Sequence, residues 1–214
     1  MKITLLCSDI QHPVNAYLTQ WMQRNEGGHD ISLVREKSAL SGGDLLFLVS
    51  CSELIGKQER NLYQSSLVLH ASKLPRGRGW SPHIWQIIEG SGEVTLTLLE
   101  AEDRVDSGRI WQQVSFNVPP DALWDEINAS LFSAEIELID FAVKNFRNIE
   151  PLEQDGSVEP TYYKRRSPND SCIDPTQSIA SQFNLMRVCD PKRFPAYFDL
   201  HGHRYKITLE KIHD

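Results

Sequence analysis

Cysteine is scarce in this 214-residue chain, and its four cysteines are far apart. They stand at positions 7, 51, 172 and 189, so none has the close sequence neighbour typical of zinc ligands. Four are also too few for the dense disulfide framework of small secreted domains. We therefore expect reduced thiols, and we assign no metal site.

Long hydrophobic runs are absent as well. Residues 1–7 are mostly apolar, but the chain then turns polar, and no run approaches the roughly 20 residues that span a bilayer. The sequence therefore predicts no membrane partner. We expect a soluble, cytoplasmic protein.

An excess of basic residues is also missing, since the formal net charge is −7. Proteins that bind a nucleic-acid backbone normally carry a basic surface, so no nucleic-acid partner is expected, although a nucleotide-sized ligand is compatible with this charge. No internal repeat is visible. The length fits one medium domain with a short addition, and we predict a main domain over residues 1–150 and an extension over 151–214.

What is present is an alternation of strand-like and helix-like segments. Residues 45–49 are continuously apolar, as in the buried strands of parallel sheets, and Asp121 is placed to cap the longest helix. This pattern predicts an α/β fold with a Rossmann-like, doubly wound and mostly parallel sheet. The expected strands are 3–7, 31–34, 45–49, 66–70, 94–99 and 110–114, and the expected helices are 14–24, 53–63, 82–90 and 121–146.

The extension has a pattern of its own. A helix is expected over residues 178–187, followed by a β-hairpin of strands 196–200 and 203–209 that turns at His201 and Gly202. The His201-Gly202-His203 sequence is better explained by this turn than by metal binding.

His70 is the strongest candidate for chemistry. It ends an apolar strand, is followed by a loop rich in proline and glycine, and can exchange a proton or donate a hydrogen bond to a developing oxyanion. Asp106, in a Val-Asp-Ser-Gly turn, could orient that imidazole. We predict that the two residues converge from the carboxyl ends of neighbouring strands. Taken alone, each has a structural explanation, as a core histidine and as an Asx turn.

Several other residues have two interpretations. Arg76 and Arg78 could face an anion or be solvated, and Trp80 and Trp85 could wall a ligand or pack in the core. Ser50, Cys51 and Ser52 follow the third strand, where open α/β sheets bind ligands, but such residues also form ordinary turns. The basic run 164–166 could hold phosphate or form a solvated face.

Several motifs together resemble a known family, the folate-dependent formyltransferases. They are His70-Ala71-Ser72-Lys73-Leu74-Pro75 with Arg78-Gly79, Trp80-Ser81-Pro82 with Trp85-Gln86-Ile87, Val105-Asp106-Ser107-Gly108, Arg166-Ser167-Pro168-Asn169-Asp170, and the closing segments 195–198 and 202–207. The resemblance covers nearly the whole chain. It implies a formyltransferase fold, 10-formyltetrahydrofolate as the formyl donor, and His70 with Asp106 beside the formyl carbon.

The same resemblance implies a binding site for the donor. It would be formed by Leu74, Pro75, Arg78, Gly79, Trp80, Trp85 and Val105. In one respect the chain departs from the family, because an asparagine normally stands two residues before the histidine and here that residue is Val68. A valine side chain cannot donate a hydrogen bond, so Ser66, Ser50 and Ser52 are candidates for supporting the oxyanion.

The chain is similar in particular to the sugar nucleotide N-formyltransferases, especially those of the pseudaminic-acid pathway. This likeness narrows the choice of the molecule that accepts the formyl group. His12-Pro13-Val14-Asn15 carries part of this likeness. It implies formyl transfer to the amine of a UDP-4-amino-4,6-dideoxy sugar. The expected substrate-binding residues are Asp9, His12, Asn15, Ser50, Cys51, Ser52 and Arg76. Alternatives are another amine, such as an aminoacyl group or another nucleotide sugar, and a non-catalytic protein that binds folate or nucleotide. A homodimer is also compatible with the sequence.

Overall fold

The computed structural model describes residues 1–212, and its centre is a six-stranded sheet in the order β2-β1-β3-β4-β6-β7. Strands β1 to β4 are mutually parallel, whereas β6 and β7 run antiparallel to their neighbours. The prediction of a mostly parallel sheet in an α/β fold is confirmed. The strands are β1 (Lys2–Leu6), β2 (Asp30–Val34), β3 (Gly43–Leu48), β4 (Tyr63–His70), β6 (Glu93–Glu100) and β7 (Ile110–Asn117).

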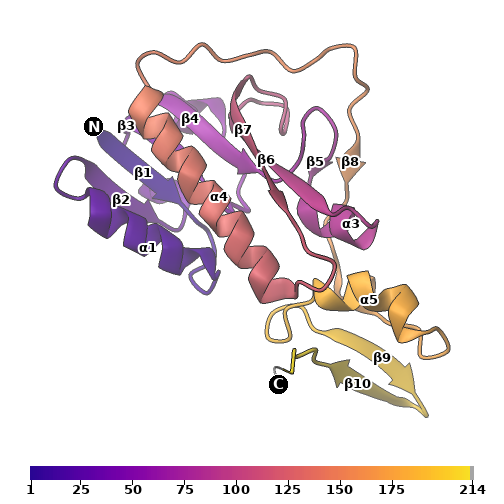
Figure 1. The fold of residues 1–214 in the computed structure, drawn as a ribbon. Helices are drawn as coiled ribbons and strands as arrows, with labels where there is room; N and C mark the ends of the chain where they lie inside the picture. Colours follow the sequence, from indigo (N-terminus) through magenta and orange to yellow (C-terminus); the bar gives the residue numbers. More distant parts are fainter. Residues whose placement is uncertain (213–214) are drawn as a thin grey trace.

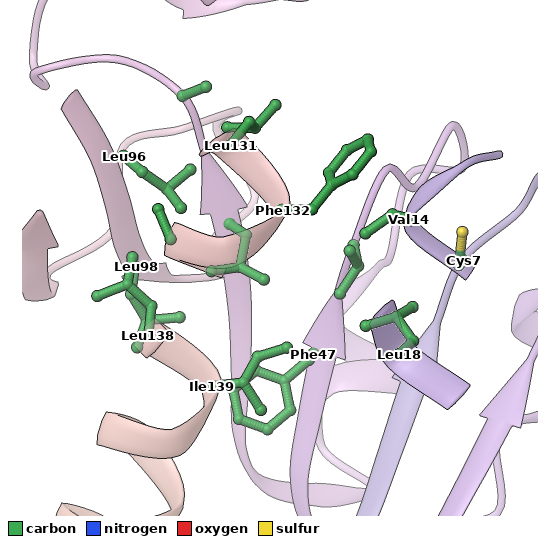
Figure 2. Close-up of a cluster of buried hydrophobic side chains, with 14 of the residues drawn as sticks. Cys7, Val14, Leu18, Phe47, Leu96, Leu98, Leu131, Phe132, Leu138 and Ile139 are labelled. Carbon is green, nitrogen blue, oxygen red and sulfur yellow. The ribbon is translucent and has the colours of Figure 1, made fainter. Parts of the chain in front are cut away.

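One face of this sheet carries the main hydrophobic core. Helices α1 (Val14–Asn25) and α4 (Trp124–Asn145) lie against it (Figure 1), and α3 (Pro82–Ile88) adds Ile87 to the same cluster. Figure 2 shows Leu98 from β6 beside Leu138 of α4, and Phe47 from β3 beside Ile139 of the same helix. Alternate strand residues point to the same face, and in β1, β3, β4 and β6 these alternate residues form the cluster.

The opposite face carries a smaller hydrophobic cluster, formed by Leu6, Leu46, Leu48, Ile55 and Tyr63, and hydroxyl side chains also link its strands. Thr4 Oγ1 lies 3.0 Å from Tyr63 Oη, and Thr95 Oγ1 lies 2.9 Å from Ser115 Oγ. Thr97 Oγ1 accepts a hydrogen bond from Gln113 Nε2 at 2.8 Å. The connection from β2 to β3 contains the 3-10 helix Lys37–Ala39, and the connection from β3 to β4 contains the one-turn helix α2 (Lys57–Arg60).

Two predicted helix boundaries are wrong. The expected helix 53–63 shrinks to α2, because Gly56 is extended and Tyr63 already pairs with Gly43 as part of β4. The long helix starts at Trp124 and not at Asp121. Glu126 accepts a hydrogen bond from the Leu123 backbone nitrogen at 2.8 Å and so caps the first turn.

After α4 the chain crosses the molecule and returns to the sheet domain before it forms the carboxyl-terminal elements (Figure 1). Strand β8 (Tyr162–Tyr163) pairs with β5 (Arg78–Gly79), and a 3-10 helix spans Pro168–Ser171. Helix α5 (Ile179–Arg187) and the hairpin β9 (Ala196–Leu200) and β10 (His203–Ile207) follow, as predicted. They share a small core with Ile173, while the boundary at residue 150 stays a prediction.

None of the helices within residues 1–212 is long and apolar enough to cross a membrane. All four cysteines are free.

Candidate active site

His70 is the last residue of β4 and is 6% exposed. Its Nε2 lies 2.8 Å from the carbonyl oxygen of Gly77, and its Nδ1 lies 3.6 Å from Asp106 Oδ2. The predicted meeting of His70 with Asp106 is therefore present in the structure. Both ring nitrogens thus face oxygen atoms, the Gly77 carbonyl at hydrogen-bond distance and the Asp106 carboxylate slightly farther away.

Asp106 reaches His70 by a route that the sequence did not indicate. It lies in the loop between β6 and β7, and β6 is antiparallel to β4, with Glu100 opposite Leu67. The carboxyl end of β6 therefore points away from His70, and the expected convergence of two carboxyl strand ends is wrong. The loop must turn back. Gly108 makes this turn possible, because a Cβ there would collide with the Glu100 carbonyl.

The Asp106 carboxylate is held by the loop that follows β4. The Gly79 backbone nitrogen donates to Asp106 Oδ2 at 2.8 Å, the same oxygen that faces His70. Asp106 has a left-handed backbone with φ of 53°, which Asp tolerates better than most residues. Gly79, at φ of +97°, packs against the Tyr163 carbonyl, where a Cβ would collide. These contacts bring His70, Asp106 and the 74–80 loop into one site.

The expected donor-binding residues lie on or next to this site. Leu74 and Pro75 are buried, and the peptide bond between them is cis. Arg78 is buried as well, and its guanidinium donates to Gln154 Oε1 at 2.6 Å. Trp80 and Val105 remain 41% and 47% exposed. Each is one residue from the hydrogen bond between Gly79 and Asp106, so together they offer apolar surface at the edge of the site.

Trp85 faces the carboxyl-terminal segment. Its ring stacks on Tyr163 at a centroid distance of 6.3 Å, and its Nε1 donates to the Lys164 carbonyl at 3.0 Å. Lys164 and Arg166 lie over the same ring. The basic run is therefore partly packed on aromatic surface, and Arg165 lies over Trp80 at 4.8 Å. Arg76 is exposed.

The expected substrate-binding residues after β1 form a tight turn. The Asn15 side-chain amide donates to the carbonyls of Asp9, Ile10 and His12, and its oxygen accepts from Arg35. Burial lowers the pKa of His12 to about 4, so its ring is neutral near pH 7. A backbone hydrogen bond from Gln11 and an ion pair with Arg193 lower the pKa of Asp9. Asn15 therefore organises this turn.

Ser50, Cys51 and Ser52 lie beside the same turn, at the carboxyl end of β3. The Ser52 backbone nitrogen donates to Ser8 Oγ at 3.1 Å, and Cys51 Sγ lies 3.7 Å from Ser8 Oγ. Ser66 lies on the face of β4 that carries Val68 and His70, and its hydroxyl is buried without a partner among the described residues. Within residues 1–212, no hydrogen bond links Ser50, Ser52 or Ser66 to His70.

A surface hollow of about 580 Å³ lies along α1, but it does not reach His70. Its lining is Asn15, Ala16, Tyr17, Thr19, Gln20 and Gln23. The convergence of two buried titratable side chains with a glycine-shaped loop is the stronger indication of a site, because such groups are costly to bury without a role.

The family model for formyl transferases matches residues 9–143 of this chain, a range that contains both His70 and Asp106. The chain belongs to the formyl transferase family. This formyltransferase is accordingly a folate-dependent enzyme that uses formyl-tetrahydrofolate as its donor.

Solved structures share the fold of this formyltransferase at low sequence identity. Methionyl-tRNA formyltransferase from Clostridium thermocellum is 18% identical with a TM-score of 0.84, covering 100% of this chain and 94% of that one. A 4-N formyltransferase from Francisella tularensis is 18% identical with a TM-score of 0.72, covering 99% and 98%. HypX from Aquifex aeolicus with tetrahydrofolic acid is 19% identical with a TM-score of 0.78, covering 95% of this chain but 36% of HypX.

The residues around His70 fit a folate donor. A pterin is a flat heteroaromatic ring that needs apolar surface and a few polar partners. The formyltransferase offers the exposed Trp80 and Val105, and within its described part Arg78 Nε and Ser72 Oγ are buried without hydrogen-bond partners.

Several residues near the site were not predicted from the sequence. Gln154 and Thr161 contact the two loops of this formyltransferase from far along the chain. His83 stands directly after the recognised Trp80-Ser81-Pro82 motif, and its Nδ1 is buried without a partner among the described residues. Burial and then the nearby His70 lower the pKa of His83 to about 4. Of these residues, only His83 could have been noticed in the sequence, because it stands beside a family motif.

Proposed function

We propose that this formyltransferase moves the formyl group of 10-formyltetrahydrofolate to the amine of a nucleotide-linked amino sugar, the 4-amino group of a UDP-4-amino-4,6-dideoxy sugar. The observation that supports this is likeness to the Francisella tularensis 4-N formyltransferase over nearly the full length of both chains. The net charge of −7 agrees with a small nucleotide-linked acceptor.

In the proposed reaction, a bond forms between the acceptor nitrogen and the formyl carbon, and the bond from that carbon to the donor's N10 breaks. One proton of the acceptor amine ends on N10, so atoms and charge balance. When bound, the donor supplies an activated formyl carbon. Leu74, Pro75, Arg78, Gly79, Trp80, Trp85 and Val105 are the residues that would hold it.

His70 and Asp106 are the proposed catalytic residues. His70 stabilises the negative charge that develops on the formyl oxygen and moves the proton, while Asp106 orients the imidazole. The contact of 3.6 Å between them supports this division of roles. Ser66 is proposed to support the oxyanion in place of the missing asparagine, with Ser50 and Ser52 as alternatives. On the acceptor side, Asp9, His12, Cys51 and Arg76 are proposed to contact the sugar nucleotide, with Asn15 holding their turn.

The experiment is a formyl-transfer assay with 10-formyltetrahydrofolate and a UDP-4-amino sugar. Replacing His70 with Ala or Asp106 with Asn is expected to lower kcat by about 10²- to 10⁴-fold, the usual contribution of acid–base catalysis. Circular dichroism checks that each variant folds. Full turnover in either folded variant would refute the assigned roles, and binding of folate and nucleotide without any turnover would indicate a binding protein.

A second acceptor is suggested by likeness to the methionyl-tRNA formyltransferase of Clostridium thermocellum over most of both chains. The acidic charge of this chain argues against a tRNA, because each phosphate contact needs a cation. Charged methionyl-tRNA and sugars linked to TDP or GDP are therefore the competing acceptors in the same assay. Turnover of one of these in preference to the UDP sugar would replace the proposed substrate.

A further inference from the structure

The connection between α4 and β8, residues 146–161, crosses the molecule and then attaches to the two loops of the site (Figure 1). Leu152 exchanges two backbone hydrogen bonds with Ile110, at 2.7 and 2.8 Å, directly after the Asp106 loop. At the other end, Thr161 accepts hydrogen bonds from the backbone nitrogens of Gly77 and Arg78, both at 2.9 Å.

Between these two attachments lies Gln154, whose side chain bonds to both loops. Its Nε2 donates to the backbone carbonyls of Asp106 and Gly108, each at 2.9 Å. Its Oε1 accepts from Arg78 Nη2 at 2.6 Å. The orientation of the amide is fixed by these partners, because carbonyls only accept and a guanidinium only donates.

These bonds bear directly on the Asp106 carboxylate. Asp106 is in the left-handed backbone region, and its carbonyl and that of Gly108 are both held by the one amide group. Rotation of this backbone would swing Asp106 Oδ2 away from His70 Nδ1 and from the Gly79 nitrogen. Gln154 thus holds the backbone carbonyl of Asp106, and Gly79 holds its side-chain carboxylate.

We propose that Gln154 is a positioning residue, which holds the Asp106 carboxylate against His70 and couples it to the donor loop through Arg78. This inference rests on the proposed function, in which His70 and Asp106 are catalytic. Gln154 touches neither reacting atoms nor His70 itself. Any effect of Gln154 on kcat must therefore act through the position of Asp106. A residue that only stabilises the fold would have no such effect.

The first test compares Gln154→Met and Gln154→Glu with wild type. Methionine keeps the length but removes every hydrogen bond, whereas glutamate can still accept from Arg78 but cannot donate to the two carbonyls. Both variants are expected to lower kcat by about tenfold, because both lose the two bonds to the Asp106 loop. Gln154→Glu keeps the Arg78 bond and should leave KM for both substrates within about twofold, whereas Gln154→Met should also raise KM for the formyl donor. A raised KM for the formyl donor with unchanged kcat would overturn the proposal, because it would assign Gln154 to donor binding.

Gln182→Ala is the matched control. The Gln182 amide also bridges a backbone, donating to the Asp174 carbonyl at 2.9 Å and accepting from the Asp174 nitrogen at 2.7 Å, but in the carboxyl-terminal region. It should leave kcat unchanged. An equal loss of kcat in this control would mean that general destabilisation explains the Gln154 effect.

A double-mutant cycle with Asp106→Asn then tests the route of action. If Gln154 acts through Asp106, adding Gln154→Met to Asp106→Asn should lower kcat by less than about twofold further. A full additional tenfold loss would show an independent effect and overturn the proposal.

Hydrogen exchange gives a readout that does not depend on activity. The amide of Gly79 is bonded to Asp106 Oδ2, so its exchange should be faster in Gln154→Met than in wild type or Gln182→Ala. An unchanged exchange rate of the Gly79 amide would overturn the positioning role, whatever the result of the enzyme assay. Conversely, faster exchange together with full activity of Asp106→Asn would refute the catalytic assignment and leave the structural coupling intact.

Discussion

The two faces of the central sheet are built by different kinds of interaction. The face under α1 and α4 is an apolar layer in which strand residues pack against α4, Leu98 beside Leu138 and Phe47 beside Ile139 (Figure 2). The face that carries His70 has a smaller apolar cluster around Leu46 and Leu48, and hydroxyl groups also link its strands, as between Thr95 and Ser115. The apolar face depends on shape and volume, whereas the surroundings of His70 on the other face depend on the direction of individual hydrogen bonds.

This difference separates stability from chemistry. Packing on the apolar face fixes the strands, and it does so with residues that can be exchanged for others of similar volume. The position of His70 relative to Asp106 depends on contacts that tolerate no such exchange, because a carbonyl needs a donor at one place. Substitutions on the two faces should therefore affect different measurements.

The largest expected effect on stability is in the apolar layer. Phe47 is fully buried, and Phe47→Ala should lower the free energy of unfolding by about 3–5 kcal/mol, because it leaves a cavity. Urea unfolding followed by circular dichroism measures this. Phe47→Leu, which keeps most of the volume, should cost less than about 1.5 kcal/mol. Equal losses in the two variants would show that volume does not control this face.

Glu135 is the exception within the apolar layer, and it should make stability depend on pH. It is 4% exposed, its Oε2 has no partner among the described residues, and burial raises its pKa from 4.5 to about 8. Between these values the unfolded chain loses the proton that the folded protein keeps. The contribution of Glu135 to stability should therefore fall as pH rises, by about 1.4 kcal/mol per unit within this window.

Glu135→Gln keeps the shape without the titration, so this fall should disappear. Unfolding experiments at pH 5, 6 and 7 compare the two proteins. The difference in unfolding free energy between the two proteins isolates Glu135, because His12 and His83, whose pKa values burial lowers to about 4, titrate alike in both. A difference that stays constant from pH 5 to 7 would contradict the assignment.

The smallest expected effect on stability is on the hydroxyl-linked face. Thr97 is fully buried, and its Oγ1 donates to the Ser72 carbonyl at 2.7 Å and accepts from Gln113. Thr97→Val should cost about 1–2 kcal/mol, because these two partners lose their bonds. It should also lower kcat, because the Ser72 carbonyl that loses its bond lies in the loop directly after His70. Thr97→Ser retains the hydroxyl and should keep kcat, and equal activity in both variants would show that the two faces do not differ in this way.

The apolar face was predictable from local pattern alone. The alternation in 94–99, the apolar run 45–49 and the helical spacing in 14–24 predicted strands and helices close to those observed. The helix predicted over 53–63 failed because Gly56 and the pairing of Tyr63 with Gly43 outweigh a polar sequence that could have been helical. The predicted start at Asp121 failed because the cap is a side chain three residues inside the helix, on Glu126.

For the site, the sequence by itself determined the identity of the chemical groups: a histidine at the end of β4, an aspartate in a glycine turn, and a loop shaped by proline and glycines. These are properties of residues and of their near neighbours. Only the tertiary structure decided how they meet, since Asp106 follows an antiparallel strand and must return through its loop, and Gln154 arrives from 48 residues further along the chain. Contacts of that range arise from the closure of the whole fold, and local residue preferences carry no information about them.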